Sequence, residues 1–92
     1  MLTVLFIGQS LVAQNGSLKG TLIDNNNNPI PFAHVEVLNS KIKTACDKNG
    51  LFALDNVDYP LVLRISAVGF LSMNKSINSS NDNLKISLKE EY

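Results

Sequence analysis

The sequence predicts an all-β protein, a sandwich of two sheets built from seven short strands. Apolar residues recur at every second position in several segments, the spacing that places side chains on one face of a strand. Glycine, proline, asparagine and aspartate divide these segments at intervals of about 8 to 12 residues, as in sandwiches and barrels. No long segment after residue 14 has the period of a helix.

The first expected element is a signal peptide over residues 1–14. The apolar run from Leu2 to Ala13 is too short for a membrane-spanning helix, which needs about 20 apolar residues. It has the length of a signal core, and Val12-Ala13-Gln14 is typical of a cleavage region. No Lys or Arg precedes the run, as expected if the basic start of the signal is clipped. The alternative interpretation is a buried first strand.

If the segment is a signal, the protein is exported, and cleavage after Ala13 would leave 79 of the 92 residues. The first strand is then expected over Leu18–Asp24. Asn25–Pro31 follows as a loop, because consecutive asparagines tolerate left-handed conformations and bond their own backbone. Prolines cannot donate to a ladder, which also favours a loop.

The second strand is expected over Phe32–Leu38 and the third over Lys41–Cys46, with a turn at Asn39-Ser40 between them. In the second strand Val35 and Val37 share the inward face. His34 and Glu36 then face outward. In the third strand one face has Lys41, Lys43 and Ala45, and the other has Ile42, Thr44 and Cys46.

Asp47–Gly50 is predicted to be a tight hairpin turn, because aspartate accepts local backbone bonds and glycine supplies a positive φ. The fourth strand then covers Leu51–Leu54, and Asp55–Pro60 is expected to be a loop. Leu61–Val68 is the strongest strand, with aliphatic residues at alternate positions and a partly polar opposite face.

The sixth strand is expected over Phe70–Ile77, with a less regular pattern, and a polar turn over Ser79–Asn83. The last strand alternates Leu84, Ile86 and Leu88 with polar residues. Each buried aliphatic side chain contributes about 1.5–3 kcal/mol before entropy is subtracted. Two facing sheets bury this set, whereas one open sheet would expose half of it.

Composition excludes some classes of function. The chain has no formal net charge and no basic face, so nucleic acid is not an expected partner. Cys46 is the only cysteine, so no disulfide can form within the chain. No cation follows or precedes it directly, and we expect it to pack as a small hydrophobe rather than to react.

No catalytic, cofactor or metal site is predicted. His34 is the only histidine, and no further ligands stand at metal-binding spacing, so an exposed strand residue is expected. Asp47–Gly50 has glycine too early for a calcium loop. The carboxylates at the strand ends are expected to cap turns: Asp24, Asp47, Asp55 and Asp58. No serine stands in the sequence setting of a nucleophile, which excludes Ser66, Ser72 and Ser76. The glycosylation patterns at Asn15, Asn74 and Asn78 are attributed to composition.

One apolar cluster has two possible roles. Phe70, Leu71 and Met73 could form a docking patch, but packing into the core is the expectation we prefer.

Four motifs follow one another with specific spacing, although each is weak alone. They are Gly20-x-x-x-Asp24, Pro29-x-Pro31-x-Ala33-x-Val35-x-Val37, Asp47-x-Asn49-Gly50-x-Phe52-x-Leu54 and Leu63-x-Ile65-Ser66-x-x-Gly69-Phe70. In this order they resemble the carboxypeptidase-regulatory-like domain, over essentially the whole chain after the signal. The family usually has glycine where this chain has Phe32, and Gly-Tyr where it has Gly69-Phe70.

The resemblance implies a seven-stranded, antiparallel or mixed prealbumin-like sandwich, similar to transthyretin, over residues 15–89, with 90–92 as the start of a linker or the chain end. Such domains have no active site and no cofactor. In Bacteroidetes they commonly precede the plug and barrel of TonB-dependent outer-membrane nutrient receptors. The resemblance therefore implies an exported accessory domain at the periplasmic face of the outer membrane, with membrane association only through a partner. That partner would be a plug, a barrel or a TonB-system component.

Two alternatives remain. The chain could be a free-standing secreted or periplasmic protein that binds a protein or a glycan, although two tyrosines and no tryptophan supply few sugar-stacking rings. A transthyretin-like hydrolase would need several histidines and an arginine near the chain end, whereas this chain has one histidine and its last arginine is Arg64. We therefore expect no enzymatic activity.

Overall fold

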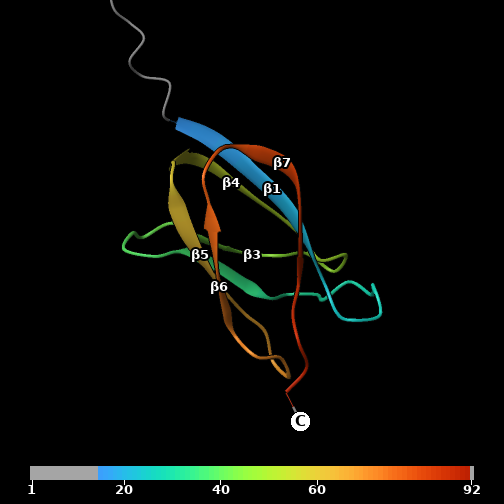
Figure 1. Ribbon diagram of the computed structural model, residues 1–92. Coiled ribbons are helices and arrows are strands. Elements are labelled where there is room, and N and C mark those ends of the chain that lie inside the picture. Colours follow the sequence, from blue (N-terminus) through green and yellow to red (C-terminus); the bar gives the residue numbers. More distant parts are fainter. Residues whose placement is uncertain (1–14, 92) are drawn as a thin grey trace, which may run out of the picture.

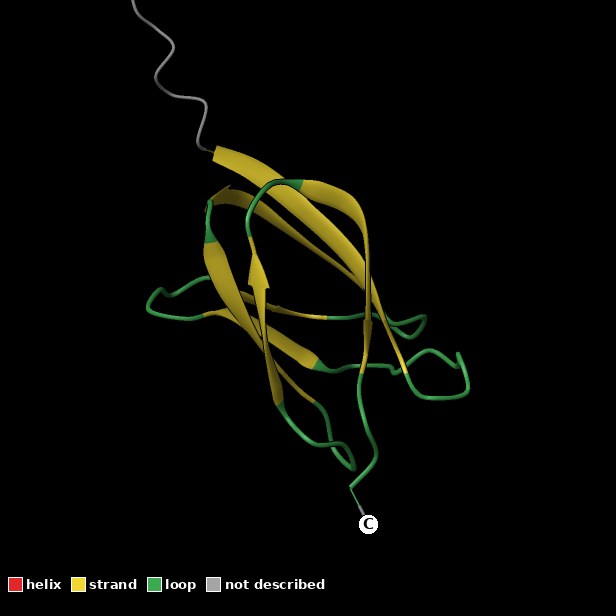
Figure 2. Ribbon diagram, viewed as in Figure 1, coloured by secondary structure: helices red, strands yellow, loops and turns green. Residues whose placement is uncertain are grey.

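The computed structural model describes residues 15–91 as seven strands in two layers (Figure 1). The predicted signal segment, residues 1–14, lies outside the described residues. Figure 2 shows strands and loops without a helix in the described part of the chain, so the predicted all-β class is confirmed. No helix within residues 15–91 has the length and hydropathy to cross a membrane. The strands are β1 (Asn15–Ile23), β2 (His34–Val37), β3 (Lys43–Ala45), β4 (Leu51–Asp58), β5 (Leu61–Ser66), β6 (Met73–Ile77) and β7 (Asn81–Ser87).

One sheet has three strands in the order β4-β1-β7, and the other has four in the order β3-β2-β5-β6. β1 pairs antiparallel with β4 and parallel with β7, whereas all pairs of the four-stranded sheet are antiparallel. The sheet is therefore mixed, as predicted. Parallel neighbours need a long connection, and here the chain between β1 and β7 builds the whole second layer.

The alternating pattern places the core between the two sheets. In β5 the buried residues are Leu61, Leu63 and Ile65, and their neighbours face outward. Val35 and Val37 of β2 face the same interior, as predicted. The remaining buried hydrophobic residues are Leu18, Leu22, Ile30, Ala33, Cys46, Phe52, Leu54, Val57, Ile77, Ile86 and Leu88.

The turn at Asp47–Gly50 is confirmed, but the predicted hairpin is wrong. The amide of Gly50 donates to the carbonyl of Asp47 at 3.0 Å, and Gly50 has φ +77. The flanking strands β3 and β4 belong to different sheets, so the turn carries the chain from one layer to the other. The hydrogen bonds within such a turn are the same in a hairpin and in a connection between two sheets, because they do not depend on which strands pair.

The predicted loop at Asp55–Pro60 is also wrong over most of its length, since β4 continues to Asp58. The register changes from Leu18↔Leu54 to Gly16↔Val57, which inserts one extra residue on β4. Asn56 occupies the bulge with φ +58, a conformation that asparagine tolerates. The bulge turns Val57 back into the core, and this break in alternation conceals the strand in the sequence.

The other strand ends differ from prediction by a few residues. β6 begins at Met73 rather than Phe70, and β7 begins at Asn81 within the predicted polar turn. Beyond β7 the chain crosses to the connection between β5 and β6. Phe70 forms an isolated antiparallel bridge with Glu90, which ties the ends of the two sheets together.

Candidate interaction surface

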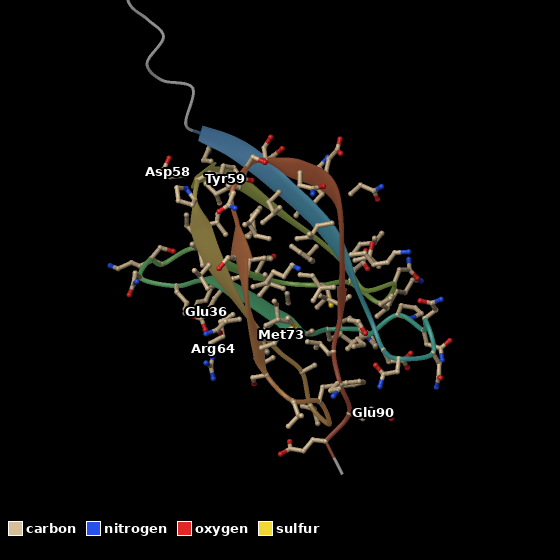
Figure 3. All side chains as sticks on the ribbon, in the orientation of Figure 1. Glu36, Asp58, Tyr59, Arg64, Met73 and Glu90 are labelled. Carbon is tan, nitrogen blue, oxygen red and sulfur yellow. The ribbon has the colours of Figure 1, made fainter. Side chains whose placement is uncertain are left out.

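The outer face of the four-stranded sheet has His34 and several charged residues. His34 is exposed, as predicted, and lies opposite Ser66 on β5. Glu36 lies opposite Arg64 on β5, and Figure 3 shows these two residues near each other. Lys43 on β3 lies opposite Glu36 on the other side, so the carboxylate is between two cations in the sheet. A shallow hollow of about 440 Å³ lies beside His34. Within residues 15–91 no group of three His, Cys, Asp or Glu side chains could hold a metal ion.

Asp24 and Asp47 shape loops rather than meet in a cleft. Oδ1 of Asp24 accepts bonds from the amides of Asn26 and Asn28 at 2.8 and 2.9 Å. Oδ1 of Asp47 accepts bonds from the amides of Asn49 and Leu51 at 2.8 and 3.0 Å. The same arrangement thus organises two loops, as expected for aspartate in turns.

The remaining carboxylate, hydroxyl and amide candidates are dispersed. Asp55 and Asp58 flank the bulge of β4 and are exposed. Ser72 and Ser76 are exposed and Ser66 is half-buried, on different strands or loops. Asn74 and Asn78 are exposed, and the side chain of Asn15 lies outside the described residues. The structure does not bring these groups together.

Cys46 is buried and has a structural role. Its thiol donates to the carbonyl of Ile30 at 3.0 Å, and its sulfur accepts a bond from the amide of Ala33 at 3.1 Å. The cysteine therefore satisfies two backbone groups of the Pro29–Ala33 turn in the interior.

Phe32 stands in a conformation that normally favours glycine. Its φ is +59, and its side chain is 66% exposed. The family pattern has glycine at this position, and the backbone angle gives the physical reason. An exposed aromatic ring in a strained conformation is a feature of the surface that folding alone does not require.

Two further hollows lie on the surface of the sandwich. A groove of about 640 Å³ follows the outer face of the three-stranded sheet, with Lys19, Thr21 and Leu51 among its walls. Its lining is mixed in polarity and has no buried charged group. A second hollow of about 460 Å³, here called the side pocket, lies between the start of β6 and the end of β7. The side pocket is lined by Asn25, Leu71, Ser72, Met73, Ser87, Leu88 and Lys89.

The apolar cluster at 70–73 divides between core and surface. Phe70 and Met73 are half-buried and pack against the core, whereas the side chain of Leu71 is 47% exposed. The sequence indicated the cluster but not the side pocket, because the pocket also needs the end of β7.

The edge strands carry features that the sequence interpretation missed. On β6, Lys75 lies opposite the fully buried Leu63, so its Cβ lies on the inward face between Met73 and Ile77, although the residue as a whole is exposed. The signal was present in the sequence, since Met73, Lys75 and Ile77 alternate within the predicted sixth strand. An inward-pointing charge on an edge strand opposes pairing with another strand.

Tyr59 lies in the connection that leads from β4 in one sheet to β5 in the other. Its hydroxyl donates to the carbonyl of Ser17 on β1 at 2.8 Å, and Figure 3 shows Tyr59 beside that strand. Desolvation by burial raises the pKa of the phenol above its ordinary 10.0.

Solved structures with a similar fold come from larger proteins. The chain resembles a chain of a type II cohesin–X-dockerin complex from Acetivibrio cellulolyticus, with TM-score 0.62 and 15% identity over 78% of this chain and 51% of that chain. It also resembles the Bacillus anthracis TIE protein, with TM-score 0.61 and 16% identity over 84% of this chain and 17% of that one. A streptococcal ancillary pilin gives 0.63 and 13% identity over 99% and 34%.

The chain thus spans about half or less of these structural relatives, and at such identities the likeness shows the fold alone. No curated protein sequence matches the chain. The model of the CarboxypepD_reg-like domain family matches residues 18–92, which include every strand except the start of β1. This match favours a non-catalytic interaction module over an enzyme. The chain belongs to the carboxypeptidase regulatory-like domain family.

Proposed function

We propose that the protein is a non-catalytic interaction domain, and that it serves as the N-terminal periplasmic module of a TonB-dependent outer-membrane nutrient receptor. The family match over residues 18–92 carries this proposal. The dispersed carboxylates and the structural bonding of Cys46 agree with a function that depends on surface rather than on chemistry.

The physical basis is a small rigid scaffold. The backbone bonds between the β5–β6 connection and the end of the chain fix one end of the sandwich, and the Tyr59 bond fixes the other. A scaffold of this kind presents strand edges and loops at constant geometry, so a partner binds without a large ordering cost.

Export is part of the same proposal. If residues 1–14 are a signal, expression with this segment should give periplasmic protein that begins at Gln14. Mass spectrometry of the periplasmic fraction measures the mature N-terminus. Cytoplasmic retention of the uncleaved chain would contradict export.

The receptor context is tested by the DNA that follows the gene and by binding. A plug-and-barrel reading frame directly downstream should be present, and its purified plug domain should bind the protein in isothermal titration calorimetry. An unrelated neighbouring gene, together with binding to a glycan or to another periplasmic protein, would instead favour the free-standing form.

A further inference from the structure

The backbone of β7 shows which way its hydrogen-bonding groups point. The amide of Leu88 donates to the carbonyl of Ile23 at 2.9 Å, so Leu88 faces β1. The carbonyl of Lys89 accepts a bond from the amide of Leu71 at 2.8 Å, on the other side. Because successive residues of a strand alternate in direction, Lys85 and Ser87 point their N–H and C=O groups away from β1.

Directly after β7, the connection between β5 and β6 forms backbone bonds with residues 89–91. Leu71 pairs with Lys89, and the amide of Glu91 donates to the carbonyl of Gly69 at 2.9 Å. β7 is the last strand of its sheet, so in residues 15–91 no strand covers the edge at Lys85 and Ser87. The amide of Asn83 is occupied by Oδ1 of Asn81 at 2.8 Å, which sets the near limit of the open stretch.

The other three edges are less suited to a visiting strand. β3 has only three residues. β4 is interrupted by the bulge at Asn56. β6 has Lys75 at an inward position opposite Leu63, and a strand paired with β6 would cover this exposed charge.

The open stretch of β7 leads into the side pocket. Ser87, Leu88 and Lys89 form one wall of this 460 Å³ hollow, and Leu71 and Met73 stand across it. A strand beside β7 would place alternate side chains inward, toward this hollow, and the others outward beside Lys85.

We propose that the outer edge of β7 binds an extended segment of a partner protein by antiparallel strand addition at Lys85 and Ser87. The antiparallel direction follows that of the bridge between Phe70 and Glu90. Acidic residues of the segment lie beside Lys85, because opposite charges on neighbouring strands attract, and aliphatic residues enter the side pocket. The inference rests on the proposed interaction function and names the site and the chemistry of the partner.

The probe is a capped six-residue peptide of alternating valine and glutamate, titrated into the full chain and followed by NMR. Binding should slow amide hydrogen exchange at Lys85 and Ser87. In the antiparallel arrangement the glutamate residues direct their amides to β7. N-methylation of the glutamate amides should therefore weaken binding at least about tenfold, whereas N-methylation of the valine amides should leave it within about twofold.

Variants of the protein test the same geometry from the other side. Lys85→Pro removes an amide that faces away from β1, so it should weaken binding about fivefold or more. Ala53→Pro is the matched control, because the amide of Ala53 also faces away from β1, on the edge of β4. Leu71→Ser should weaken binding, whereas Leu51→Ser, with a side chain of similar exposure on the opposite edge, should not.

If a proline variant does not fold, the proposal is tested by reversing the charge at position 85 and in the peptide. Lys85→Glu should weaken binding of the valine–glutamate peptide, and a valine–lysine peptide should recover it. Lack of binding, protection of β4 or β6 amides instead, or loss of affinity on methylation of the valine amides would each overturn the proposal.

The proposed receptor function can fail separately. A plug domain that binds the wild-type protein and Lys85→Glu equally well leaves the receptor function intact and refutes the edge assignment. A plug domain that binds neither, together with peptide binding and protection at Lys85 and Ser87, refutes the receptor context and keeps the edge.

Discussion

The edges of β6 and β7 lie on the same side of the sandwich, but they differ in how readily an additional strand could pair with them. β6 has the exposed Lys75 at an inward position and a half-buried Met73, whereas the inward positions of β7 hold Leu84 and Ile86, and Leu88 follows directly after the strand. The β6 edge is protected by a charge whose burial would be costly. The β7 edge lacks that protection, and one end of it already pairs with the chain itself. Two strands of similar length can therefore have opposite capacities for association.

The largest expected difference between the two strands is in the free energy of unfolding that is lost when a packed side chain is shortened. Leu88, directly after β7, is 1% exposed, and Leu88→Ala should lower the free energy of unfolding by about 3 kcal/mol because it leaves a cavity. Met73→Ala at the start of β6 should lower it by about 1 kcal/mol, because that side chain is only half-buried. Urea denaturation measures both. If the two variants lost the same free energy of unfolding, Leu88 would not be packed more tightly than Met73.

Backbone packing gives the next effect. A Cβ on Gly20 would lie 2.8 Å from the ring of Phe52 and 2.9 Å from the carbonyl oxygen of Leu84 in β7, so Gly20→Ala should cost about 2 kcal/mol. Gly69, before β6, has open space but φ +87, so Gly69→Ala should cost about 1 kcal/mol through strain alone. Thermal denaturation of the two variants compares them. A larger loss for Gly69→Ala would show that β7 is not closely packed on β1.

The protective charge can be removed directly. Lys75→Val should expose an apolar edge on β6 and cause concentration-dependent association, which sedimentation velocity measures. Lys85→Val is the control, because the side chain of Lys85 does not lie on the inward face of its strand. If Lys75→Val stays monomeric at high concentration, the charge is not what protects the β6 edge.

The smallest effect concerns the connection between β4 and β5, where the side chain of Tyr59 bonds to β1. Because burial raises the pKa of Tyr59 above 10.0, the folded state holds the phenolic proton more tightly than the unfolded chain does. The resulting stability is complete below pH 10 and is lost as the pH rises through the folded pKa. In Tyr59→Phe this part of the alkaline loss should disappear, and pH-dependent urea denaturation of both proteins measures it. Identical alkaline profiles would contradict a contribution from Tyr59.

Much of the fold could be predicted from local pattern. Alternation identified the inward faces of β2, β5 and the end of β7, and the asparagine run identified a loop in which Asn27 adopts φ +66. The Asp47–Gly50 turn was predictable because its bonds are made within five residues. The order of four weak motifs identified the family, which the family model confirms.

The candidate surface was predicted only in part. Leu71 and Met73 were recognised as a cluster, but the side pocket forms because residues 87–89 are brought beside them. The open edge of β7 could not be inferred from its own residues, since an edge is defined by the absence of a neighbour in the sheet.

The sequence by itself determined the inward faces of β2 and β5, the turn at Asp47–Gly50 and the family, because each of these depends on residues close together in the chain. Only the tertiary structure decided that β3 and β4 belong to different sheets and that the bulge at Asn56 restores Val57 to the core. It also decided which edge remains open. Strand pairing joins residues that are distant in sequence, and period-two alternation is compatible with many pairings, so the choice among them is made by the packing of the whole sandwich.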